Sequence, residues 1–149
     1  MLLIGLKNFG TQTVLEDGVV NVGSVYRRFC KKNRCGVPAF ATTANGVTLN
    51  HEGIYHITAT FVGTASAAGA VTIQLALNGV LVDGALSTQT VTTADTEVRT
   101  FVIDYYAKVD SNCVLGVNST DTQTVTFVNV SDAIDITLTD VIVNVDKVV

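Results

Sequence analysis

Residues Gly46–Val62 read GVTLNHEGIYHITATFV and carry the clearest strand signal of the chain. Apolar side chains occupy every second position from Tyr55 to Phe61, and His56, Thr58 and Thr60 lie between them. Side chains of a strand point alternately to its two faces, so this pattern predicts a half-buried antiparallel strand. The same alternation recurs to the end of the chain, with no convincing helix between. We therefore expect an all-β protein.

Composition limits the class of protein. A chain of 149 residues is one domain of ordinary size. Charged residues make up 15% of it, against a usual value of about 25%, and the mean hydropathy is +0.42. Such an apolar surplus favours burial between subunits; the alternative is a sandwich with threonine-rich faces. The net charge of −4 argues against a general nucleic-acid binder.

Valine and threonine dominate the chain and proline occurs once, at Pro38, which favours strands. We expect a single domain, 1–149, in which residues 1–38 are a lead-in and residues 39–149 the main body. The expected strands are Leu2–Leu6, Thr11–Leu15, Val19–Phe29, Ala39–Thr43, Val47–Asn50, Ile54–Val62, Val71–Asn78, Val80–Leu86, Glu97–Val109, Val114–Val117, Thr122–Val130 and Ile134–Val145. Short strands separated by turn signals are typical of a sandwich or barrel.

Several turns follow from local chemistry. Asn45-Gly46 and Asn78-Gly79 predict two-residue hairpins, because both central positions need a positive φ. Asp83-Gly84 predicts a turn or a bulge. The apolar alternation of the last strand changes phase, which predicts a bulge or bend near Thr139-Asp140. Two small or polar segments are expected to be exposed loops: Gly63–Ala70 and Ser87–Thr96.

The order of motifs resembles a known family. EGIY (52–55), an alternating strand, a Gly/Ala loop, the hairpin VTIQLALNG (71–79), a long aromatic strand and VTFVNVSDAIDITLTDVIVNV (125–145) resemble the C1q/TNF-like jelly roll. In that family a Gly-x-Tyr follows a turn and opens a core strand, as Gly53-Ile54-Tyr55 does here. The lead-in, with KNFGTQTV (7–14) and GVVNVGSVYRRF (18–29), resembles small C1q/TNF-like proteins of bacteriophages and prophages.

The resemblance implies an antiparallel two-sheet jelly-roll sandwich that assembles as a homotrimer. It also implies a virion component, such as a capsid decoration protein, a head fibre or a tail-associated knob. The partners of the protein would be further copies of itself and the major capsid protein or another virion protein. The protein would be made in the bacterial cytoplasm and would be located on the capsid exterior.

Two groups of residues are candidates for the trimer interface. In C1q/TNF-like trimers, aromatic residues of the inner sheet stack around the threefold axis, and the closing strand runs along that axis. The resemblance thus assigns the following residues to the interface: Tyr105, Tyr106, Val141, Val143 and Val145. Neighbours on a strand point oppositely, so one of the two tyrosines should face the axis and the other the core.

Five of the nine basic residues fall within eight positions: Arg27, Arg28, Lys31, Lys32 and Arg34. We interpret this basic turn as a docking site for an acidic capsid surface. One alternative is a solvated hairpin tip, whose lysines protect a strand edge from aggregation. Nucleic acid is a weaker alternative, because no aromatic residues interleave with the basic ones.

Signals for chemistry are weak. His51, Glu52 and His56 suggest a metal, but zinc normally needs three or four converging ligands, and we expect no metal site. We find no nucleophile elbow, P-loop or dinucleotide motif, and no marked carboxylate pair. We therefore expect no cofactor and no enzymatic activity.

The number of cysteines, three, is odd. We expect free thiols, with a bridge between Cys30 and Cys35 as the alternative, and a buried structural role for Cys113. Neither a signal peptide nor a membrane span is expected from the apolar pattern, so a membrane is not an expected partner.

Two functions remain in view. The first is a trimeric capsid decoration protein, which acts by shape and adhesion. The second is a trimeric knob that binds a receptor or a bacterial surface glycan. The chain has no tryptophan, and most of its aromatic residues fall at predicted core positions, which favours the first function.

Overall fold

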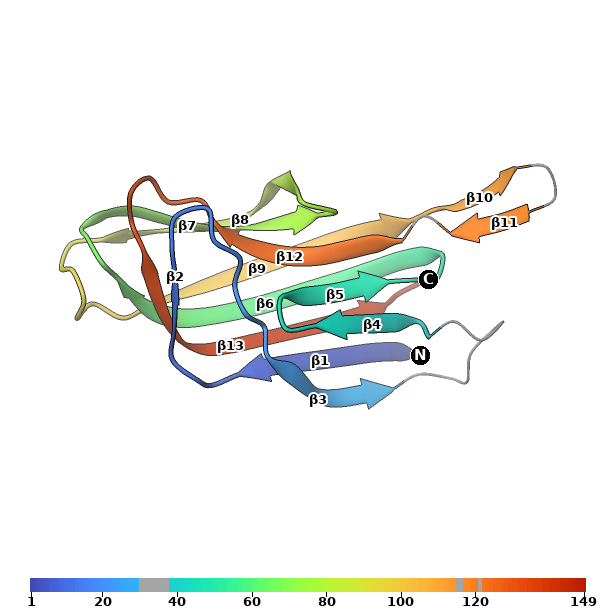
Figure 1. The fold of residues 1–149 in the computed structure, drawn as a ribbon, viewed down its shortest axis with the longest axis horizontal. Helices are drawn as coiled ribbons and strands as arrows, with labels where there is room; N and C mark the ends of the chain where they lie inside the picture. Colours follow the sequence, from blue (N-terminus) through green and yellow to red (C-terminus); the bar gives the residue numbers. More distant parts are fainter. Residues whose placement is uncertain (30–37, 115–116, 121) are drawn as a thin grey trace.

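The computed structural model describes residues 1–29, 38–114, 117–120 and 122–149; for 111–114 and 117–120 it describes the backbone pairing alone. In these ranges all regular secondary structure is β-strand (Figure 1). The described residues therefore contain no helix that could span a membrane. The strands are β1 (Leu2–Asn8), β2 (Gln12–Val14), β3 (Ser24–Phe29), β4 (Phe40–Thr43), β5 (Gly46–Leu49), β6 (Gly53–Ala65), β7 (Gly69–Leu77), β8 (Val80–Val91), β9 (Arg99–Val109), β10 (Ser111–Val114), β11 (Val117–Thr120), β12 (Gln123–Asn129) and β13 (Ile136–Lys147).

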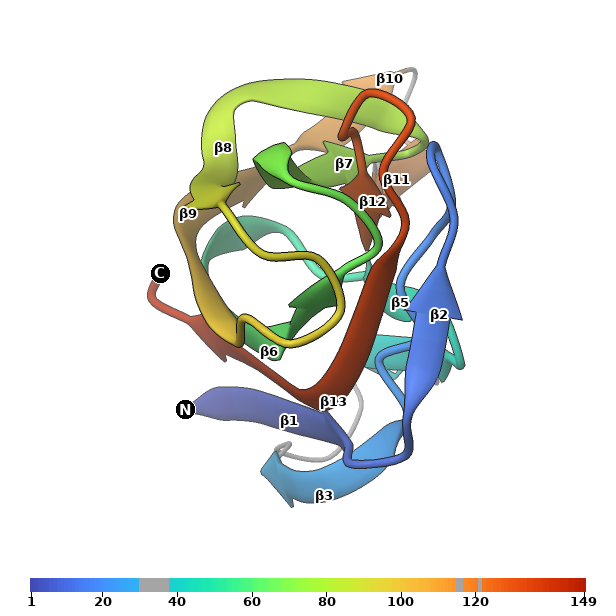
Figure 2. The same cartoon turned by 90° about the vertical axis from the view of Figure 1, so that its left-hand side faces the viewer.

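The strands form two antiparallel sheets that pack face to face. Sheet A has the order β3-β1-β13-β6-β9, and β2 pairs with the first part of β13. Sheet B has the order β4-β5-β12-β7-β8. Strands β10 and β11 form a separate hairpin that projects from one end of the sandwich (Figure 1). In the end view, β8 lies beside β9 and closes one side (Figure 2).

The core lies between the inner faces of the two sheets. Phe61 of β6 and Phe127 of β12 meet there edge to face, with ring centroids 5.1 Å apart. Burying a side chain of this size contributes about 1.5–3 kcal/mol. Tyr55 is fully buried and donates its hydroxyl to the carbonyl of His51 at 2.7 Å. Burial raises the pKa of Tyr55 to about 12, because the phenolate would have to lose its water.

Most of the predicted local features are confirmed. β6 alternates buried and half-buried side chains from Tyr55 to Ala65. Asn78 and Gly79 both have positive φ values, 52° and 79°, as a tight hairpin requires. Gly84 has a φ of 81°, and the pairing of β7 with β8 shifts there, which is the expected irregularity. The pairing of β13 with β6 shifts between Leu138 and Asp140, where the bulge was expected.

The Asn45-Gly46 turn was predicted one residue too late. The β4–β5 hairpin pairs Thr43 with Gly46, so its turn is Ala44-Asn45 and Gly46 belongs to β5. A Cβ on Gly46 would collide with the carbonyl oxygen of Val125 on the neighbouring strand. This glycine therefore serves a close approach between strands and not a positive φ.

Both predicted loops are shorter than expected. Strand β6 runs to Ala65 and β7 starts at Gly69, and β8 continues to Val91. The alternation of threonine with other residues sustains these strands, because β-branched side chains suit a pleated surface. The single strand expected at Val114–Val117 is replaced by the hairpin β10–β11.

The strand expected at Val19–Phe29 is split. Val20 donates its N–H to Phe127 in sheet B, whereas Ser24 pairs with Lys7 in sheet A. Gly23 lies between them with a φ of 80°, so the chain changes sheets at this residue. Strand β1 lies between β3 and β13, so the lead-in is part of the sandwich itself.

Candidate functional site

The outer face of sheet A carries exposed apolar and aromatic side chains in register across its strands. One row runs through Phe29, Leu3, Asp146, His56 and Tyr106. A second row ends at Val102, which is 57% exposed. Large apolar side chains gathered on one face are typical of an interaction surface. We call this surface the sheet A face and define it by these residues: Leu3, Tyr26, Phe29, His56, Val102, Asp104, Tyr106, Ile142, Asn144 and Asp146.

Tyr26 lies flat across strand β1 on this face. Its hydroxyl donates to Oδ1 of Asn144 at 2.7 Å. A Cβ on Gly5 would lie only 2.8 Å from the Tyr26 ring, so the absence of a side chain at Gly5 lets the ring lie on the sheet. Tyr26 remains 41% exposed, and its ring presents a flat apolar surface outward.

His56 and Tyr106 form the opposite side of the sheet A face. Their rings are stacked, with centroids 4.5 Å apart and an interplanar angle of 14°. Nε2 of His56 lies 2.8 Å from Oδ1 of Asp104. Asp146 pairs with His56 from the other neighbouring strand, and its Oδ1 is buried without a hydrogen-bond partner in the described residues. A buried acceptor of this kind is costly unless a donor reaches it.

The two candidate tyrosines point in opposite directions, as the alternation of β9 predicts. Tyr105 is half-buried and packs against the core, whereas Tyr106 is 58% exposed on the sheet A face. Val98 and Val102 share the outward direction of Tyr106. The outward face of β9 thus carries apolar side chains at Val102 and Tyr106, with Thr100, Asp104 and Lys108 between and beside them.

The interface assignment of the β13 valines is wrong. Val141, Val143 and Val145 are fully buried inside the single chain, where they pack in the core between the two sheets. Their side chains are thus unavailable to a neighbouring subunit. The outward positions of β13 are those between them, occupied by Ile142 and Asn144, and both are partly exposed.

The described part of the basic turn has two different roles. Arg27 is exposed, with its guanidinium carbon 5.9 Å from the centroid of the Tyr26 ring. Arg28 donates to the carbonyl of Phe40 at 2.6 Å and so ties β3 to β4. Lys31, Lys32, Arg34, Cys30 and Cys35 lie outside the described residues, as does the side chain of Cys113. Docking through the basic turn stays a prediction.

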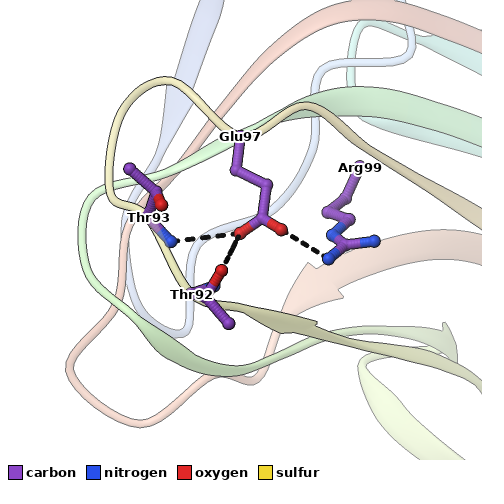
Figure 3. A network of polar contacts seen from close by, with 4 residues as sticks. All are labelled: Thr92, Thr93, Glu97 and Arg99. Carbon is purple, nitrogen blue, oxygen red and sulfur yellow. Dashed lines mark hydrogen bonds and ion pairs between the residues drawn. The ribbon is translucent and has the colours of Figure 1, made fainter.

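A polar network orders the loop between β8 and β9 (Figure 3). The carboxylate of Glu97 accepts the backbone N–H groups of Thr92 at 2.6 Å and Thr93 at 3.1 Å, and it pairs with Arg99. These donors hold the pKa of the Glu97 carboxyl below its usual value. The contacts link residues of one loop and the strand that follows it, so we assign them a local structural role.

The candidate metal ligands do not converge in the described structure. No group of three or more His, Cys, Asp or Glu side chains in the described residues could hold a metal ion. His51 lies in the turn before β6, where its carbonyl accepts the Tyr55 hydroxyl. His56 lies on the sheet A face with Asp104.

Sequence reasoning missed part of the sheet A face. The exposure of Tyr26 and Phe29 on this face was not expected, because aromatic residues were assigned mainly to the core. The signal that could have found Tyr26 is Gly5, an isolated glycine in an apolar strand pattern, which often marks a close approach by another group.

Comparison with known proteins supports the fold. No family model and no curated sequence matches the chain. The globular domain of the zebrafish complement 1qA protein superposes with a TM-score of 0.63 and 7% identity, over 100% of this chain and 98% of its own. Eiger TNF from S. frugiperda gives a TM-score of 0.61 and 12% identity, over 100% and 94%.

The PRD1 vertex protein P5 is also similar, with a TM-score of 0.51 and 15% identity, over 99% of this chain and 97% of its own. At these identities the likenesses concern the fold alone. The chain has a C1q/TNF-like jelly-roll fold, an all-β sandwich of two antiparallel sheets, as its sequence predicted.

Proposed function

We propose that the chain is a non-enzymatic structural protein that assembles as a homotrimer through the sheet A face. The observation that carries this proposal is the set of exposed apolar side chains there, above all Val102 and Tyr106. Burial of such side chains between subunits drives association. The buried Oδ1 of Asp146 adds support, because a donor from a neighbouring subunit would satisfy it.

The trimer would be a decoration protein on a bacteriophage capsid. Three observations support this: the resemblance of the lead-in to phage-encoded proteins, the cluster of basic residues from Arg27 to Arg34 in an otherwise acidic chain, and the fold shared with a phage vertex protein. A trimer suits a threefold position of an icosahedral shell, where three identical contacts act together. Binding to the assembled shell alone would stabilise it.

The first test is the native mass of the purified chain by light scattering after size exclusion. We expect three times 15.7 kDa, about 47 kDa. A stable monomer across micromolar concentrations would contradict self-association through the sheet A face. Capsid binding is tested by co-sedimentation with undecorated capsids. Substitution of Arg27, Arg28, Lys31, Lys32 and Arg34 by glutamine should abolish it if these residues dock.

A second candidate function is a knob that binds a glycan on the bacterial surface. A specific observation favours it: Phe9 is 56% exposed and lies beside amide side chains at one edge of sheet A. An exposed ring next to hydrogen-bonding amides is the kind of surface on which a sugar ring stacks.

A further inference from the structure

A shallow, open hollow lies between the end of β1, the segment that enters β3 and the β4–β5 turn. Its lining includes Lys7, Phe9, Asn21 and Ser24. Strand β3 is the edge strand of sheet A, so the hollow lies at the border of the sandwich. Lys7 and Ser24 begin the row that ends at Val102, so the hollow adjoins the edge of the sheet A face. We call it the Lys7 hollow.

Hydrogen bonds hold the polar wall of the Lys7 hollow in place. The backbone carbonyl of Asn21 accepts from Nε2 of Gln12 at 2.8 Å and from Nδ2 of Asn8 at 3.0 Å. The backbone N–H of Asn21 donates to Oε1 of Gln12 at 2.9 Å, and Gly23 donates to Oδ1 of Asn21 at 2.8 Å. This wall is therefore formed before any ligand arrives, which lowers the entropic cost of binding.

The same contacts leave hydrogen-bond donors unused. Oδ1 of Asn21 is occupied by Gly23, whereas its Nδ2 has no partner among the described residues. The Ser24 hydroxyl likewise makes no hydrogen bond within the part of the chain that the structure describes. An amide nitrogen carries two donors and a hydroxyl one. The wall thus offers donors to a ligand rich in oxygen.

Lys7 supplies a positive charge that forms no salt bridge with the described part of the chain. Its ammonium lies 5.4 Å from the centroid of the Phe9 ring and 5.8 Å from that of Tyr26. Among the described residues, no Asp or Glu oxygen comes within 4.0 Å of it. In a chain of net charge −4, this cation between two ring faces is an attractive point for an anion.

We propose that the Lys7 hollow binds a carboxylate-bearing sugar residue of an acidic glycan. The Phe9 ring would pack against the apolar face of the sugar, and Lys7 would pair with its carboxylate. Asn21 and Ser24 would donate to its hydroxyl groups. A neutral sugar would leave the lysine unused, and an acidic peptide would make little use of the exposed ring. The inference rests on the second candidate function and gives it a site and a ligand class.

The test is calorimetric titration with tetragalacturonate, an oligosaccharide with one carboxylate per sugar. Galactotetraose serves as the neutral control and tetraglutamate as the acidic peptide control. We expect binding of tetragalacturonate alone. Lys7→Gln should weaken it about tenfold or more, since the lost contact is a charge-assisted hydrogen bond. Phe9→Ala should weaken it by a similar factor.

Lys108→Gln is the matched control, because Lys108 is an exposed lysine on β9 that pairs with Asp110, away from the Lys7 hollow. It should bind like the wild type. Melting temperatures close to the wild-type value would establish that the variants fold.

Equal binding of galactotetraose or tetraglutamate would overturn the proposed ligand class. Tetragalacturonate binding that survives both Lys7→Gln and Phe9→Ala would overturn the site but keep the glycan-binding function. No binding at millimolar tetragalacturonate would overturn the site proposal; a panel of other surface glycans would then decide the function.

Discussion

The two outer faces of the sandwich differ sharply in chemistry. On sheet B, threonines of neighbouring strands pair through their hydroxyls: Thr48 with Thr124 at 3.0 Å, and Thr72 with Thr88 at 2.7 Å. On sheet A, the corresponding surface presents stacked rings, exposed valines and charged groups, with Val102 and Tyr106 more than half exposed.

The difference indicates which face needs a partner. The hydroxyl pairs of sheet B satisfy each other within the chain, and the exposed apolar side chains of this sheet, Val80, Leu81 and Leu86, all lie on its edge strand β8. The sheet A face leaves apolar area exposed and one carboxylate oxygen of Asp146 buried with no donor among the residues that the structure describes. Both features favour a second protein surface over solvent.

The largest loss of stability is expected from a substitution on the inner face of sheet A. Val143→Asp places a charge in the core without a partner, and it should remove most of the stability of the domain, on the order of 4 kcal/mol or more. Ile142→Asp, one residue along on the outer face, should leave a folded chain. Urea denaturation followed by circular dichroism measures both. Similar unfolding midpoints for the two variants would contradict the assignment of faces on β13.

A pH series tests the same inner face at Tyr55. Its pKa of about 12 in the folded chain lies above the usual tyrosine value of 10. The stabilisation from burying the neutral phenol is therefore fully present below pH 10 and is lost as the pH rises from 10 to 12. Two pKa units correspond to about 2.7 kcal/mol.

The measurement is the unfolding midpoint in urea at pH 9 and near pH 12, for the wild type and Tyr55→Phe. Phenylalanine cannot ionise, so the decline due to this residue should disappear in the variant. If both proteins lose stability equally over this range, other groups cause the decline.

Measurements of self-association test directly which of the two outer faces forms the interface. Val102→Asp adds a charge to the sheet A face and should weaken the oligomer about tenfold or more, because a desolvated charge opposes burial. Thr90→Asp, on the exposed side of β8, is the matched control and should leave the oligomer intact. Light scattering over a dilution series distinguishes them. Dissociation by Thr90→Asp but not by Val102→Asp would move the interface to sheet B.

The smallest effect is expected from the hydroxyl pairs. Thr72→Val removes one partner of the Thr72–Thr88 pair on an open face and should change stability by about 0.2–1 kcal/mol, with no change in native mass. Thermal unfolding and light scattering check the two parts. A change in native mass would show that the threonine face takes part in assembly.

Sequence reasoning succeeded where a feature depends on a short stretch of chain. The alternation of β6, the Asn78-Gly79 hairpin and the bulge after Leu138 follow from the two-residue period of a strand and from turn chemistry. It failed at Val141, Val143 and Val145, whose alternation was recognised but whose direction was assigned to the wrong side. A two-residue period shows that the two faces of a strand differ, but it does not show which face packs against the other sheet.

The all-β class, the C1q/TNF-like resemblance and the spacing of most strands could be read from the chain alone, because strand periodicity and turn chemistry are local patterns. Which residues share a surface depends on how the strands are ordered in the two sheets. Tyr26 reaches Asn144 across 118 positions because β1 lies between β3 and β13, and Gly5 leaves room for the ring. His56 meets Asp104 because β6 pairs with β9. Strand order brings these groups together, and no local pattern encodes that order.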